Sequence, residues 1–177
     1  MGELIEVKNK VLARGIHYMT SPYGMRTLNG VTKMHNGVDL VSFENGQTTI
    51  DYVCAYDDGI VTQKGFDDEI GYYVTINHGS FESRYQHLRY TSILYVGEQV
   101  FKGWIVGLMG STGVSTGAHL DFRIRKDGQW VDPMPYLEED NDNSWEWAIS
   151  NGIILPYTDK EATPTNADVV SMLYMMK

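Results

Sequence analysis

Short runs of alternating apolar and polar residues fill most of the chain up to residue 137, and Asp-Gly and His-Gly-Ser turn signals separate them. Alternation with a period of two places every second side chain on one face, which is typical of a strand with one buried face. The runs span residues 52–56, 59–64, 71–77, 81–88, 99–109 and 119–125. We therefore predict a mainly β domain built on an antiparallel sheet.

Residues 17–30 depart from this alternation because turn residues occur in two places. Pro22 and Gly24 mark the first turn, and Asn29-Gly30 marks the second. We expect this part of the chain to be rich in loops.

The composition changes after residue 137. Residues 138–177 carry 8 acidic and 2 basic side chains, which leaves 15 acidic and 12 basic among residues 1–137. Helical spacing appears in the tail, and Thr165 with Asp168 three residues later is a plausible N-terminal cap. The apolar positions with this spacing are Trp145, Ala148 and Ile149, then Val169, Met172, Leu173 and Met176. We predict a domain over residues 1–137 and a small C-terminal appendage over 138–177, formed by an acidic linker and a helix–loop–helix.

The overall charge and hydropathy exclude several classes of partner. A net charge of −9 argues against a protein that binds nucleic acid by neutralising phosphates. No apolar run is long enough to span a membrane, and no signal peptide is visible at the start. Cys54 is the single cysteine, so it forms no internal disulfide, and its setting predicts a packed strand residue.

A glycine- and hydroxyl-rich turn, residues 110–118, leads into the last alternating run. Because side chains on a strand alternate between faces, His119 and Asp121 are expected to point the same way, roughly 7 Å apart at their Cα atoms. Histidine and aspartate are both metal ligands and proton carriers. This strand therefore presents a candidate site at the mouth of a loop.

Two further histidines have polar company. A straight strand would hold His35 and Asp39 roughly 13 Å apart, so a shared role requires the bend that Asn36-Gly37 can supply. His87 lies at the end of a predicted strand. Together with His119 and Asp121, these residues supply three metal ligands, an open position for water and spare histidines for proton transfer, which is the minimum for a catalytic zinc site. For His17 and His78 we expect structural or surface roles.

Several motifs, in this order and spacing, resemble the lysostaphin-like (LytM-type) zinc metalloendopeptidases over about residues 17–137. They are Thr20-Ser-Pro-Tyr-Gly-Met-Arg26, His35-Asn-Gly-Val-Asp39, Asp58-Gly59, Tyr85-Gln-His-Leu88, Gly97-Glu-Gln-Val-Phe-Lys-Gly103, and Gly110-Ser-Thr-Gly followed by Gly117-Ala-His-Leu-Asp-Phe122. The resemblance implies that His35 and Asp39 bind zinc and that His87 and His119 flank the water bound to the metal.

At the third ligand position the chain departs from the family, whose histidine is replaced here by Asp121. If that histidine binds through Nδ1, an aspartate oxygen lies the same number of bonds from the backbone and reaches the same place. Zinc accepts carboxylate oxygen at about the distance of imidazole nitrogen. A His-Asp-Asp set neutralises the dication, so we expect a weaker Lewis acid and better competition from harder ions such as Mn²⁺.

From the resemblance we expect a metal-dependent endopeptidase that hydrolyses peptidoglycan cross-bridges or stem peptides. Segments 27–34, 43–50 and 64–70 are expected to form loops that select the substrate. Its place of action would be the bacterial cell wall, outside the cell or on a virion, directly or after accumulation in the cytoplasm. Two alternatives remain open: a catalytically degenerate module that binds cell wall or regulates another hydrolase, and an assembly component that docks on a protein partner through its acidic tail.

Overall fold

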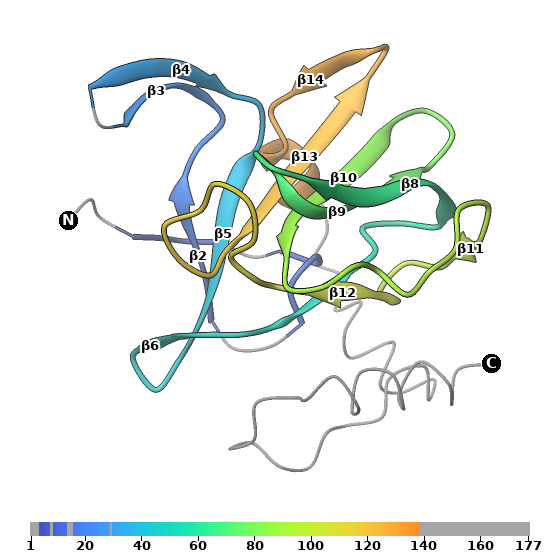
Figure 1. The fold of residues 1–177 in the computed structure, drawn as a ribbon, viewed down its shortest axis with the longest axis horizontal. Coiled ribbons are helices and arrows are strands. Elements are labelled where there is room, and N and C mark those ends of the chain that lie inside the picture. Colours follow the sequence, from blue (N-terminus) through green and yellow to red (C-terminus); the bar gives the residue numbers. More distant parts are fainter. Residues whose placement is uncertain (1–3, 8, 14–15, 29, 139–177) are drawn as a thin grey trace.

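A computed structural model describes residues 4–7, 9–13, 16–28 and 30–138. These residues form a ten-stranded antiparallel sheet (Figure 1). In spatial order its strands are β1 (Ile5–Glu6), β2 (Ile16–Ser21), β5 (Val38–Glu44), β13 (Leu120–Lys126), β10 (Glu82–Leu88), β9 (Gly71–Asn77), β8 (Gly59–Asp67) and β11 (Gln99–Val100), with β6 (Gln47–Thr49) beside β5 and β14 (Gln129–Val131) beside β13.

Two small sheets complete the strand structure. One pairs β7 (Tyr52–Cys54) with β12 (Ile105–Leu108), and the other is the hairpin of β3 (Gly24–Leu28) and β4 (Val31–His35). A short helix, α1 (Met134–Glu138), follows β14. The predicted antiparallel β architecture is therefore confirmed. The prediction of a helical appendage falls almost wholly on residues 139–177, outside the described residues, and the boundary at residue 137 stays a prediction.

The alternation in β13 separates a core face from a polar face. Leu120, Phe122 and Ile124 are fully buried in the main core. The residues between them, Asp121 and Arg123, lie on the opposite face because successive strand side chains point to opposite sides. Cys54 is buried in β7, as predicted, and burial raises the pKa of its thiol.

Three local predictions were wrong. Residues 17–30 contain most of β2 and all of β3 rather than mainly loops. The run 99–109 is interrupted at Gly103, whose φ of 82° requires a glycine-like conformation, so β11 and β12 belong to different sheets.

The segments expected to be loops, 27–34, 43–50 and 64–70, are largely hairpin strands. The clearest case joins β5 to β6 through Asn45-Gly46, where both residues have positive φ. An Asn-Gly pair with this geometry forms the tight turn whose twist matches that of the strands. The described residues contain no helix with the length and apolar character of a membrane span.

Candidate metal centre

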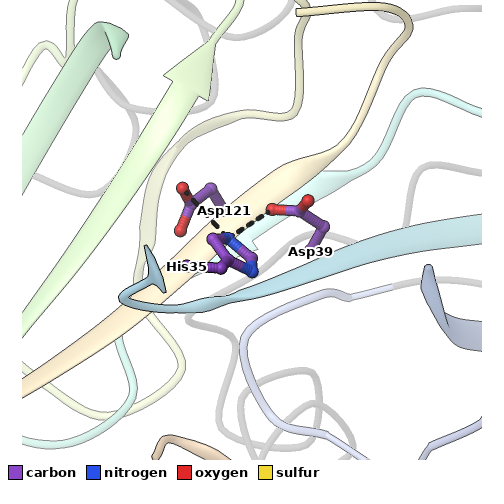
Figure 2. A group of neighbouring side chains, drawn as sticks. All are labelled: His35, Asp39 and Asp121. Carbon is purple, nitrogen blue, oxygen red and sulfur yellow. Dashed lines mark ion pairs between the residues drawn. The ribbon is translucent and has the colours of Figure 1, made fainter. Parts of the chain in front are cut away.

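The structure brings His35, Asp39 and Asp121 into one buried cluster (Figure 2). His35 ends β4, Asp39 lies in β5, and Asp121 is the direct cross-strand partner of Asp39 in β13. His35 Nε2 lies 3.1 Å from Asp39 Oδ1 and 3.6 Å from Asp121 Oδ2, so the imidazole faces both carboxylates. One ligand atom from each residue lies within 4.8 Å of the others.

The bend that unites His35 and Asp39 occurs at Asn36-Gly37, between the end of β4 and the start of β5. β4 pairs with β3, whereas β5 pairs with β13 and β2, so the chain changes partners at this point. A Cβ atom on Gly37 would overlap the Asp121 carboxylate and come within 2.6 Å of Arg123 Cγ. The predicted bend is confirmed, and glycine is required there because the bend packs against the cluster.

The hydrogen bonds of His35 fix which nitrogen faces the carboxylates. Nδ1 lies 2.9 Å from the carbonyl oxygen of Pro22 and donates to it. In the neutral ring Nε2 is then an acceptor, facing a second acceptor, Asp39 Oδ1. Both atoms are buried without a hydrogen-bond partner among the described residues. Two acceptors 3.1 Å apart need a proton or a cation between them, and one nitrogen with two carboxylates is a donor set that fits Zn²⁺.

Without a metal, the imidazole itself carries the compensating charge. Burial alone lowers the pKa of His35, but the adjacent Asp121 and Asp39 carboxylates outweigh it and raise that pKa to about 9. Burial raises the pKa of each carboxyl group, yet contact with His35 holds both below their usual range, with Arg123 contributing at Asp121. The metal-free cluster is therefore an imidazolium held between two carboxylates.

Each carboxylate also has its own guanidinium. Arg26 Nη1 donates to Asp39 Oδ2 at 2.7 Å and to Ser21 Oγ at 2.6 Å. Arg123 holds both oxygens of Asp121, with Nη2 2.7 Å from Oδ2 and Nε 3.0 Å from Oδ1. Sequence reasoning missed both partners, although Arg123 lies two residues from Asp121 and so on the same strand face.

His87 reaches the cluster side of the sheet through an irregularity in β10. Pairing with β9 shifts register between Tyr85 and Leu88, and His87 has a φ of 59°. Tyr85 and Leu88 are both fully buried in the core, so the extra residue at this bulge lets Gln86 and His87 share the other face. A left-handed conformation in a residue other than glycine costs about 1 kcal/mol or more, and it persists where the surroundings impose it.

Backbone carbonyls set the tautomers of both candidate catalytic histidines. His87 Nδ1 donates to Thr112 O at 2.7 Å, and His119 Nδ1 donates to Gly117 O at 2.8 Å. Nε2 of each neutral ring is then available as a base. The rings lie 4.6 Å apart between centroids, and His119 Nε2 is 3.8 Å from Asp39 Oδ1. Burial lowers the pKa of His87, which keeps it neutral near pH 7.

A family model for peptidase family M23 matches residues 33–133, more than half of the chain. This span contains the three candidate ligands and both candidate catalytic histidines. The chain belongs to peptidase family M23. Peptidases of this family are zinc metalloendopeptidases.

Individual relatives agree with this assignment. The chain is 34% identical over 120 residues to peptidoglycan DD-endopeptidase ShyA of Vibrio cholerae, covering 66% of this chain and 26% of ShyA. The catalytic domain of lysostaphin from Staphylococcus simulans is 31% identical with a TM-score of 0.56, over 67% of this chain and 90% of that domain. A zinc-containing peptidase from Vibrio cholerae is 26% identical with a TM-score of 0.58, over 73% of this chain and 40% of that one. The chain spans about a quarter of the length of the curated endopeptidases Mpg and ShyA that it matches.

Two other histidines have the structural roles expected of them, and one buried polar residue was not singled out from the sequence. His78 bonds to Asp58 O and Ser83 Oγ, and His17 pairs with Asp51, which fits the structural roles expected of both. Gln86, which sequence reasoning passed over, is the cross-strand partner of Asp121 and is buried with both amide atoms unpartnered among the described residues. Its position inside the motif Tyr85-Gln-His-Leu88 was a usable signal.

Proposed function

We propose that this chain is a metal-dependent endopeptidase that hydrolyses peptidoglycan cross-bridge or stem peptides. The observation that carries the proposal is one constellation: three converging ligand atoms, two of them unpartnered and buried, beside two histidines whose Nε2 atoms are free to act as bases. Membership of the M23 family and the similarity to a peptidoglycan DD-endopeptidase support the substrate class.

In this mechanism His35, Asp39 and Asp121 hold the ion. Bound zinc supplies Lewis-acid polarisation of the scissile carbonyl and acidifies water. His119 and His87 present unprotonated Nε2 atoms, fixed by the carbonyls of Gly117 and Thr112, and one of them accepts a proton from the attacking water. The resulting imidazolium then donates to the developing oxyanion or to the leaving amine.

Two carboxylate ligands would cancel the charge of a divalent ion, but each carboxylate here is paired with a guanidinium group. Asp39 with Arg26, and Asp121 with Arg123, are formally neutral pairs. A divalent ion in this cluster therefore keeps a net positive environment although two of its ligands are carboxylates. We propose zinc as the resident ion, with a harder ion such as Mn²⁺ able to compete for the two oxygen ligands.

The direct test combines metal content with turnover. The purified chain should hold about one zinc ion and should release peptides from peptidoglycan. His119→Ala and His87→Ala should retain the ion and lose hydrolysis, because neither residue supplies a ligand. Normal turnover by either variant would remove that residue from the mechanism, and a chain that binds no divalent metal would overturn the enzyme assignment.

A second function is favoured by one specific observation: ion pairs hold the metal-free cluster together when His35 is protonated. Its imidazolium then lies beside both carboxylates, and each carboxylate also contacts one guanidinium group. This arrangement suits a catalytically degenerate module that binds cell wall or regulates another hydrolase. Co-sedimentation with intact peptidoglycan, unaffected by chelator and without peptide release, would favour this alternative over the peptidase.

The proposed place of action is the bacterial cell wall, outside the cell or on a virion. A protein partner for the acidic residues 138–177 stays a prediction. Deleting them should weaken such an association, and unchanged association would count against it.

A further inference from the structure

Beside the candidate metal centre, the same face of the sheet carries a partly buried arginine, Arg84. In β10, Gln86 pairs across the sheet with Asp121, and Arg84 pairs with Arg123. Residues two apart on a strand share a face, so Arg84 follows Gln86 on the side that holds the cluster. Along the strand, Arg84 and Gln86 lie roughly 7 Å apart at their Cα atoms, which is the length of two residues of extended peptide.

The Arg84 side chain is held by four neighbours. Its Nε donates to Thr75 Oγ1 and its Nη2 donates to Gln63 Oε1, each at 2.9 Å. The guanidinium lies 5.4 Å from the ring centroid of Tyr73 and 5.1 Å from that of Trp130. Two hydrogen bonds and two aromatic rings fix the group in one orientation, so little further entropy is lost when it binds a ligand.

All four of these neighbours are neutral, and this distinguishes Arg84 from the arginines around it. Arg123 is paired with Asp121, and Arg125 is paired with Glu82 at 3.7 Å. Among the residues that the structure describes, no carboxylate lies within ion-pair distance of Arg84, and its Nη1 makes no hydrogen bond. Burial lowers the pKa of Arg84 and repulsion from Arg123 and Arg125 acts in the same direction, whereas Tyr73 and the more distant Glu82 carboxylate act against it. A partly desolvated cation without a directly bonded counter-ion is stabilised when an anion joins it.

We propose that Arg84 binds a free carboxylate of the peptide substrate, carried one or two residues from the scissile bond. This proposal rests on the peptidase function proposed above and names the chemistry that the site selects. Guanidinium and carboxylate match in shape and charge, and the peptides of peptidoglycan end in free carboxylates. The two-residue spacing between Arg84 and Gln86, the cross-strand partner of Asp121, sets how far the carboxylate lies from the reacting carbonyl.

The test compares acid and amide forms of one substrate. Cross-linked muropeptide dimers are hydrolysed in their natural form and after their carboxyl groups have been converted to amides. A charge-assisted hydrogen bond contributes about 1.5–3 kcal/mol, so the natural chain should prefer the acid form by about tenfold to a hundredfold in kcat/KM, mainly through KM.

Arg84→Gln should remove this preference by lowering kcat/KM for the acid form much more than for the amide form, whereas Arg84→Lys should restore part of it. Arg125→Gln is the matched control, because Arg125 lies on the same face near the same Trp130 ring but is paired with Glu82. It should keep the preference. An acid preference that persists in Arg84→Gln, or is equally lost in Arg125→Gln, would overturn the proposal.

Calorimetry that measures the affinity for a tripeptide acid and for its C-terminal amide tests the carboxylate site separately from the peptidase function. If the chain hydrolyses nothing yet binds the acid more tightly than the amide, and Arg84→Gln abolishes the difference, the carboxylate site stands and the peptidase assignment fails. If the chain hydrolyses both forms equally and binds both equally, the carboxylate site fails and the peptidase assignment stands.

Discussion

Asp121 and Arg123 form an ion pair that stabilises a buried carboxylate beside a second one. The carboxylate is 2% exposed and lies directly across from Asp39, so two negative charges share a buried space. Arg123 grips both oxygens of Asp121 through three contacts of 2.7 to 3.2 Å. The carboxylate is buried, the guanidinium is partly buried, and the pair is hydrogen-bonded and formally neutral, which is the condition under which charges are tolerated inside a protein.

Replacing Arg123 by glutamine should separate the stability of the fold from metal affinity. The change leaves the buried Asp121 carboxylate with His35 but without its hydrogen bonds to Arg123, so the metal-free chain should lose about 1.5–3 kcal/mol of unfolding free energy. Zinc affinity should rise by about tenfold, because one positive charge beside the ion is removed. Thermal unfolding with and without zinc, and competition against a chromogenic chelator, measure the two effects.

Arg125→Gln serves as the control, since Arg125 lies on the same strand face without contacting Asp121. A weaker zinc affinity in Arg123→Gln would contradict the electrostatic argument and would indicate that Arg123 acts mainly by positioning Asp121.

The proton on His35 should make metal binding depend on pH. The pKa of His35 in the metal-free fold is about 9, above the value of 6.5 for the unfolded chain. Stability from this contact is fully present below pH 6.5 and is lost as the pH rises through about 9. A metal must displace the proton, so binding at pH 7 should release about one proton per ion and strengthen up to about pH 9.

Calorimetry at pH 7 in two buffers of different ionisation enthalpy measures this proton release. A binding enthalpy that is independent of the buffer would show that His35 is already neutral and would contradict the prediction.

At the scale of elements, two local irregularities build the site: the bend between β4 and β5 and the bulge in β10. The bend could be predicted because Asn36-Gly37 is a turn signal between two ligand-type residues. The bulge could not, because Tyr85-Gln-His-Leu88 carries no glycine or proline to mark an extra residue, and His87 itself adopts the left-handed conformation. Its cause is tertiary: Tyr85 and Leu88 are both fully buried in the core.

The same contrast explains the rest of the comparison between sequence and structure. Alternation identified the antiparallel sheet, because a period of two depends only on local geometry. The hairpin at Asn45-Gly46 was mistaken for a loop although its turn chemistry is explicit. The placement of Arg26 on Asp39 depends on the fold of the β3–β4 hairpin, which alternation does not specify.

Gly37→Ala should damage the metal centre without touching a ligand. The added methyl group would overlap the Asp121 carboxylate and Arg123, and backbone at Phe122 O lies 2.7 Å from the new atom, so the neighbours must move. We expect a loss of about 1–3 kcal/mol in stability and at least a tenfold loss in zinc affinity. Chemical denaturation and chelator competition measure the two losses.

Gly65→Ala is a matched control, since its added Cβ would make only ordinary contacts with Tyr73 from 3.5 Å. Zinc affinity in Gly37→Ala equal to that of the Gly65→Ala control would contradict the role assigned to the bend.

At the scale of the whole molecule, charge is distributed unevenly: the chain is acidic, but arginines gather on one face of the sheet. The chain carries a net charge of −9, and 8 of its acidic residues lie in residues 138–177. The sheet face around Trp130 nonetheless gathers Arg84, Arg123 and Arg125. Arg123 and Arg125 are paired with carboxylates, so the charge of Arg84 is the one left without an ion pair among these three arginines. A local positive charge on an acidic protein attracts an anionic peptide group to that place, so it helps orient a substrate before contact.

The pairing of Asp39 with Asp121 also has a consequence for how the chain reaches its native state. The two aspartates are neighbours across β5 and β13, yet 82 positions of sequence separate them. Contacts between such distant segments form late, because closing so long a loop costs entropy before any pairing compensates for it. A chain in which β5 and β13 are not yet paired therefore lacks the proposed set of ligands, so binding of the proposed ion would report that these two strands have paired.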